Sequence, residues 1–192
     1  VEYRSARQQH LVGGTFDAEP GRPVELPRPR IGRGQNRHLI GGQAARFAPL
    51  AELYRRAVEQ VNAPGADVRI SVASPGFVGD DAQAAKDLWW THYHEAFRAL
   101  GEIRGFPAPQ RAAYDREANG AGALFVGSPD EIADRILALH GAMGHDRHFF
   151  QMDLGQLPQK EFLKSIELLG TKVKPLVDAA LAGKAGTPGA TE

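Results

Sequence analysis

The chain of 192 residues contains no cysteine. Disulfides, thiolate metal sites and cysteine nucleophiles are therefore excluded. Its 23 Lys and Arg residues balance 23 Asp and Glu residues, so there is no electrostatic footprint for general binding to nucleic acid or to a membrane surface. No apolar run approaches the roughly 20 residues of a membrane span, and the first residues lack the pattern of a signal peptide. We expect a soluble, cytoplasmic protein that binds neither nucleic acid nor membranes.

The two ends of the chain lack the regular patterns of the middle. Residues 1–37 hold seven Arg, no Lys and four closely spaced prolines, and proline withdraws hydrogen-bond donors from helices and sheets. We predict an irregular Arg/Pro-rich arm over residues 1–37 and a flexible tail over residues 183–192. The patterned part is residues 38–182.

Strand and helix patterns alternate within this middle part. Strand-like runs lie at 37–42, 68–73 and 147–154, with a fourth candidate at 10–14, and each of the first two is followed by an amphipathic helix. Helices are predicted at 43–61, 81–103, 129–143 and 159–181. The second of these helices is expected to be capped by Asp80 and to stop at Gly105. A loop with one or two helical turns is predicted at 106–123. This alternation predicts βα units around a parallel sheet. Three or four strands are few for a sheet that needs both faces covered.

The stretch "LFVGSPDEIADRI" at 124–136 has two readings. Gly-Ser-Pro before a helix is either a phosphate cradle or a helix start. Ser128 can cap, Pro129 suits the first helical position, and Glu131 completes a Ser-x-x-Glu capping box. Because Asp130 and Glu131 already place negative charge there, the local electrostatics favour a cap.

The apolar stripe of the last predicted helix consists of Phe162, Leu163, Ile166, Leu169, Val173 and Leu176. Four stretches, in their order along the chain, resemble the second half of the bacterial luciferase-like, flavin-dependent monooxygenases. They are "LIGGQAARFAPLAELYRRA", "VASPGFVGDDAQAAKD", "GALFVGSPDEIADRILALHGAMGHDR" and "FFQMDLGQLPQKEFLKSIELLGTKVKPLV". The resemblance covers roughly residues 38–177. It implies a TIM-type (β/α) barrel of which this chain carries only the C-terminal half, and reduced FMN or the deazaflavin F420 as cofactor. The implied chemistry is oxygen activation or hydride transfer on a small organic substrate that the motifs do not specify.

The resemblance also supplies the candidate site. The family's Gly-Gly-Thr-Pro-Glu-Ser motif helps to hold the flavin phosphate, but here the first three residues run into Arg/Pro-rich sequence, as in a degenerated or out-of-frame segment. Barrel sites lie at the carboxyl ends of the strands. The candidate cofactor-binding residues at such ends are Gly13, Gly14, Thr15, Gly41, Gly42 and Ser74. Plain βα turns are the alternative reading, and Pro75 stands where the family often has a histidine. No catalytic residue is assigned.

Histidines and aromatic residues offer two further candidates. His140, His145 and His148 are close in sequence, as are His92 and His94, but zinc needs three or four converging ligands. The resemblance places His140 and His145 in barrels without a metal, so no metal site is expected. Trp89, Trp90, Tyr93 and Phe97 either line a cleft or pack in the core, and their helical spacing favours packing.

Two functions are consistent with these features. The first is a flavin-dependent, luciferase-like monooxygenase or oxidoreductase, inactive on its own if it is truncated. The second is a non-catalytic half-barrel that folds or functions only by self-association or with a partner chain. Half a barrel exposes strand edges and inner side chains, for which Ile70, Val72, Phe149, Phe150 and Met152 are the candidates. A homodimer with a large apolar interface is therefore expected.

Overall fold

The structure is a computed structural model, and it describes residues 36–40, 44–61 and 69–185. The chain divides into two units, Val1–Arg30 and Ile31–Glu192, and all described residues belong to the second. Five of the six candidate cofactor-binding residues lie outside the described residues, namely Gly13, Gly14, Thr15, Gly41 and Gly42. The strand candidate at 10–14 also lies outside them.

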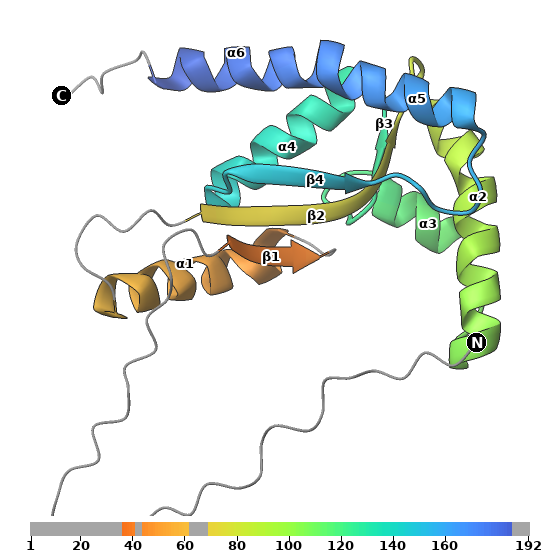
Figure 1. Cartoon of the computed structure of the whole chain (residues 1–192), viewed down its shortest axis with the longest axis horizontal. Coiled ribbons are helices and arrows are strands. Elements are labelled where there is room, and N and C mark those ends of the chain that lie inside the picture. The colour runs from red at the N-terminus through yellow and green to blue at the C-terminus, as the bar shows by residue number, and fades with distance from the viewer. Residues whose placement is uncertain (1–35, 41–43, 62–68, 186–192) are drawn as a thin grey trace, which may run out of the picture. The chain divides into compact units, whose positions relative to one another are not determined.

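Strands and helices alternate along the described chain, as the sequence predicts (Figure 1). The strands are β1 (Asn36–Ile40), β2 (Arg69–Val78), β3 (Phe125–Gly127) and β4 (Arg147–Gln151). The helices are α1 (Ala44–Val61), α2 (Ala82–Arg104), α3 (Arg111–Ala118), α4 (Pro129–Met143), α5 (Gln159–Leu168) and α6 (Lys174–Ala185), with a π-helical turn η1 (Leu169–Val173) joining the last two. The fold is α/β with a small parallel sheet, and α6 continues three residues into the segment expected to be a tail.

β2 is the central strand of the sheet. β1 and β4 pair with its first part, on opposite sides, and β3 pairs with Gly76 to Val78 at its end, all in parallel. The strand predicted at 68–73 continues to Val78, because β3 pairs with this extension of β2. Pro75 lies where the partners of β2 change, a position that tolerates the missing N–H of proline.

One face of the sheet is covered by helices. α4 packs between α1 and α6, and all three contribute to a core with Ile70 and Val72 of β2. Phe150 and buried Met152 pack into the same core, so these four side chains point at the helices. Of the inner side chains expected from sequence, Phe149 alone is exposed, at 45%.

The aromatic residues of α2 form a second core. Trp89 is fully buried, and its ring centroid lies 6.3 Å from that of Tyr114 in α3 and 5.3 Å from that of Tyr93. Tyr93 also stacks against Phe97 at 4.5 Å. The predicted packing role of this group is confirmed.

The helix ends follow local sequence with one exception. Gly105 and Gly144 end α2 and α4 in the left-handed conformation, as glycine does readily. The cap of α2 is Asp81, whose side chain accepts a hydrogen bond from the Ala84 N–H, and the prediction of Asp80 is wrong. Asp80 instead forms an ion pair with Lys164 of α5.

The α5–α6 segment buries a different side from the predicted stripe. Ser165, Leu168 and Val173 are buried, whereas Leu163, Ile166 and Leu176 are exposed. The reason is a hydrogen bond of 2.7 Å from the Val78 N–H to Ser165 Oγ, which turns the side of α5 that carries Ser165 onto the end of β2. This prediction is therefore wrong for three of its six residues.

Candidate functional site at the carboxyl ends of the strands

The carboxyl ends of β2, β3 and β4 lie at one edge of the sheet, where barrel enzymes bind their ligands. Ser165 of α5 and a hydrogen bond of 3.0 Å from the Gly79 N–H to the Gly127 carbonyl fix this edge. Two hollows open there. One, of about 230 Å³, lies between the end of β2, the start of α2 and α5, and the other, of about 520 Å³, lies between the start of α4 and η1–α6.

The charged groups of this edge largely satisfy one another. Asp80 lines both hollows and pairs with Lys164, and this contact raises the pKa of the Lys164 ammonium. The larger hollow places Asp130 and Lys172 on its walls. With two carboxylates against one ammonium in that hollow, it is poorly suited to a phosphate.

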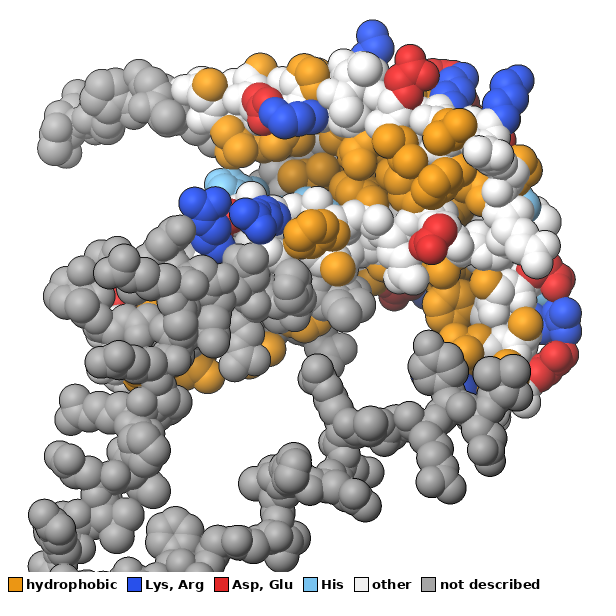
Figure 2. All heavy atoms as spheres, in the orientation of Figure 1, with side chains coloured by type: hydrophobic (Ala, Val, Ile, Leu, Met, Phe, Trp, Pro, Cys, Tyr) orange, Lys and Arg blue, Asp and Glu red, His pale blue; other side chains and the backbone are white. Residues whose placement is uncertain are grey.

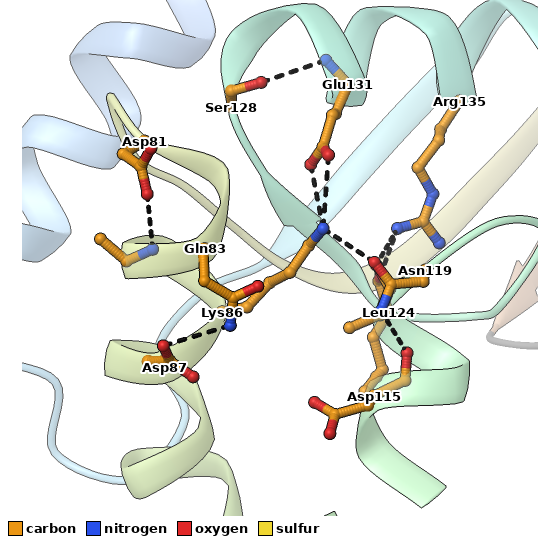
Figure 3. Close-up of polar contacts among 12 residues, drawn as sticks. Asp81, Gln83, Lys86, Asp87, Asp115, Asn119, Leu124, Ser128, Glu131 and Arg135 are labelled. Atoms are coloured by element: carbon orange, nitrogen blue, oxygen red, sulfur yellow. Dashed lines mark hydrogen bonds and ion pairs between the residues drawn. The ribbon is translucent and has the colours of Figure 1, made fainter. Parts of the chain in front are cut away.

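The start of α4 is a cap, and the predicted cap is confirmed. Ser128 Oγ accepts from the Glu131 N–H at 3.4 Å, with Pro129 at the first position. Glu131 does not complete the capping box, because its carboxylate lies 3.2 Å from Lys86 Nζ of α2, which also donates to Asn119 Oδ1 at 2.9 Å (Figure 3). The carboxylate at the helix start is thus held by a nearly buried lysine.

Arg135 of α4 ties the preceding loop to the same helix. Its guanidinium donates to the carbonyl oxygens of Leu124 and Gly122, both at 2.7 Å, and of Ala118 at 2.9 Å. It also lies 4.5 Å from the centroid of the Phe125 ring. Burial lowers the pKa of Arg135, and the carbonyl partners compensate the buried charge. Sequence reasoning missed this residue because its partners are backbone groups.

Ser74 lies inside β2 and not at a strand end. It is paired with Phe150 of β4 and is 3% exposed. Its neighbour Gly76 is required by close packing, since a Cβ there would lie 2.6 Å from the Phe125 carbonyl oxygen and 2.7 Å from the Phe150 ring. Of the predicted site residues, Ser74 is therefore the one that the structure describes, and it is buried.

The side of the sheet away from α4 carries an open face. It consists of Ala73 and Pro75 of β2, both half-buried, and Arg147, Phe149 and Gln151 of β4, all exposed. The register pairs Ala73 with Phe149 and Pro75 with Gln151, so these four side chains form the carboxyl half of the face. Pro75, where the family often has histidine, thus faces this open side.

The loop after β4 closes against α2. Gly155 has a φ of 67°, and its carbonyl oxygen lies 2.7 Å from His92 Nδ1. A Cβ on this residue would lie 1.9 Å from the His92 carbonyl oxygen. Glycine is required at this position because the backbone of the loop lies so close to that of α2.

The three C-terminal histidines lie at the opposite edge of the sheet, beside a groove of about 310 Å³ between α4, β4 and α6. His148 stacks between the rings of Phe125 and Phe150, with centroids at 4.7 and 4.8 Å. Burial lowers the pKa of His148 to about 3 and that of His145 to about 4. Across the described residues, no group of three or more His, Asp or Glu side chains is placed to hold a metal ion.

Comparison with known proteins shows that the fold of this chain is similar to that of several solved structures. No protein-family model matches the chain, and no curated protein matches it. Among solved structures, monooxygenase RslO1 from Streptomyces bottropensis is 21% identical with a TM-score of 0.59, over 72% of this chain and 40% of that chain. The oxygenating constituent of 3,6-diketocamphane monooxygenase from the CAM plasmid of Pseudomonas putida, a type II Baeyer-Villiger monooxygenase solved with FMN, is 19% identical with a TM-score of 0.54, over 73% and 42%.

A third structure, the EDTA monooxygenase EmoA from Chelativorans sp. BNC1, is 14% identical with a TM-score of 0.52, over 81% of this chain and 43% of that chain. This chain therefore spans less than half the length of each. In the described ranges no helix is long and apolar enough to cross a membrane. Along about 72% of its length, this chain shares the fold of the luciferase-like flavin monooxygenases.

Proposed function

We propose that the chain supplies the C-terminal βα units of a luciferase-like, flavin-dependent oxidoreductase of the monooxygenase type, acting on a small organic substrate with FMN or F420. On this proposal the units form part of a barrel, and the rest of that barrel lies outside these residues. The shared fold and the ordered motifs of residues 38–177 support it.

The open face of the sheet is the observation that carries this proposal. A parallel sheet is stable when both faces are covered, and in a barrel the second face lines the interior. The carboxyl half of this face carries the Phe149 ring, which is 45% exposed, the half-buried Ala73 and the exposed amide of Gln151. Such a surface suits a flat heteroaromatic ring with polar edges.

The fit to a whole flavin is partial. The open face suits the ring system, and a bound flavin would supply the two-electron redox chemistry of the family. The phosphate would need backbone N–H groups or cations. The residues proposed for that role are Gly13, Gly14, Thr15, Gly41 and Gly42, and Ser74, which is buried, is not proposed for it.

Flavin titration of the purified chain tests the proposal. We expect the purified protein to contain no flavin. When FMN or F420 is added, we expect the protein to quench the fluorescence of the added cofactor only weakly, and Phe149→Ala should quench it less than the unaltered chain. Phe106→Ala is the matched control, because Phe106 is also partly exposed, at 37%, but follows the end of α2. Stoichiometric FMN in the isolated monomer would contradict incompleteness, and quenching that Phe149→Ala and Phe106→Ala leave equal would contradict the open face as the site.

A non-catalytic half-barrel is the second candidate. Pro75 at a position facing the open side favours it, because proline offers no proton donor where the family often has histidine. Complete absence of flavin binding, in the monomer and in any assembled form, would support this alternative over the first.

A further inference from the structure

Two apolar patches lie on the outermost helices of the layer that covers the sheet. α1 and α6 both pack on α4, so each has one flank without a helix neighbour in the described chain. The α1 patch consists of Leu50, Leu53 and Val61, exposed at 51%, 53% and 41%. The α5–α6 patch consists of Leu163 and Ile166 of α5, exposed at 54% and 44%, whereas Leu176 lines the hollow beside the start of α4. Exposed aliphatic side chains grouped in this way indicate a contact surface.

Each patch follows an outer strand of the sheet in the chain. α1 follows β1, and α5–α6 follow β4. β1 and β4 flank β2 on opposite sides, and within the described residues each pairs with β2 alone. Figure 2 shows hydrophobic side chains gathered beneath the α5–α6 segment, on the side of β4. Unpaired strand edges are templates for another strand, so strand edge and helix patch together form two docking surfaces.

We propose that two copies of this chain associate edge to edge. The α1 patch of one copy lies beside the α5–α6 patch of the other, β1 of the first lies beside β4 of the second, and the two open faces turn toward each other. A twofold axis along the strands keeps neighbouring strands parallel and forms both contacts at once, as a closed assembly requires. The proposal deepens the proposed function, because it names the polypeptide that covers the open face.

A second copy fits these surfaces better than a single peptide. One helix or strand would cover one patch and leave the other, with the open face, in water. A second copy covers both patches and the open face together. The lengths of the solved structures are consistent with two copies. This chain spans 40–43% of the length of the monooxygenases that share its fold, so two copies together span most of the length of one such chain.

The absence of cysteine allows a direct test of this arrangement. Leu53→Cys in the α1 patch and Leu163→Cys in the α5–α6 patch are prepared separately and then mixed, and a short bismaleimide is added. We expect covalent dimers in the mixture and only control levels with either variant alone. Ile103→Cys is the control, since Ile103 is 82% exposed on α2 and outside both patches.

Sedimentation at several concentrations provides the second measurement. The unmodified chain and Ile103→Lys should sediment as dimers, and Ile166→Lys should shift the population to monomer. Cross-linking of either cysteine variant with itself would overturn the edge-to-edge arrangement. A monomer at every concentration would overturn the dimer. Cross-linking and sedimentation do not depend on flavin. If both show no dimer, the dimer is excluded, and the flavin titration still tests the proposed function separately.

Discussion

The ammonium group of Lys86 on α2 lies 3.2 Å from a carboxylate oxygen of Glu131 in the first turn of α4. The lysine is nearly buried, and its second acceptor is Asn119 at the end of α3. This one cation therefore joins α2, α3 and α4 around the start of β3 (Figure 3). Removing it leaves a carboxylate and an amide oxygen without their donor.

Lys86→Met should lower the free energy of unfolding by about 1–3 kcal/mol, as expected for a hydrogen-bonded charge in a largely buried site. Arg98→Met is the control on the same helix, because its ion pairs with Glu95 and Glu102 are exposed and should contribute less than about 1 kcal/mol. Urea unfolding of both variants measures the difference. Equal losses in the two variants would show that the Lys86 network is not specially stabilising.

Gly155→Ala should destabilise the loop after β4 by more than about 2 kcal/mol, through a positive φ and a clash with backbone. The Cβ would lie 1.9 Å from the His92 carbonyl oxygen, so relief requires movement of the loop or of α2. Gly141→Ala in α4 meets no atom within 4 Å and should stabilise by up to about 1 kcal/mol. Thermal unfolding of the two alanine variants compares them, and opposite signs are expected.

Acid should destabilise the fold through the buried histidines. Burial lowers the pKa of His148 to about 3 and that of His145 to about 4, whereas an unfolded histidine titrates near pH 6.5. The unfolded state therefore binds more protons below about pH 6.5, and stability is lost as the pH falls from there toward the folded pKa values. Between about pH 6.5 and 5 each histidine should remove on the order of 2 kcal/mol.

His148→Phe should flatten this pH dependence, because Phe fits between the rings of Phe125 and Phe150 and cannot be protonated. Unfolding by urea at several pH values gives the slope, with His94→Phe on α2 as the control for removing a histidine elsewhere. An unchanged slope in His148→Phe would show that His148 is not responsible.

Features set by neighbours in sequence were predictable here, and features set by distant partners were not. The caps at Ser128, Gly105 and Gly144 depend on local backbone chemistry, and each was read correctly. The acceptors of Lys86 lie 33 and 45 positions away, and the extension of β2 depends on β3. The buried side of α5 depends on Ser165, whose hydroxyl accepts a hydrogen bond from the Val78 N–H, 87 positions away.

The candidate site shows the same difference between features set by neighbours in sequence and features set by distant partners. The family motifs predicted the fold at the level of βα units, but Ser74 lies inside a strand because β2 continues past Pro75. The open face was predictable only in outline, since alternation along β4 assigns Phe149 and Phe150 to opposite faces but does not say which one the helices cover.

Pro75→His restores the family's histidine on the open face. We expect oxygen consumption driven by NADH or by reduced flavin to stay at background in this variant, because on the proposed function the described strands form only part of a barrel and one side chain does not complete it. An oxygen electrode measures it, with the unaltered chain as reference. A large gain from this single change would mean that the site is much more complete than the open face indicates.

The central claim is that this chain is part of a barrel and is stable only in association. Denaturant unfolding, followed by circular dichroism across a wide range of protein concentrations together with light scattering, tests it most directly. An assembly whose folding is coupled to association has an unfolding midpoint that rises with protein concentration. We predict such a rise, with a dimer mass at the higher concentrations. A compact monomer whose midpoint is independent of concentration would contradict the account.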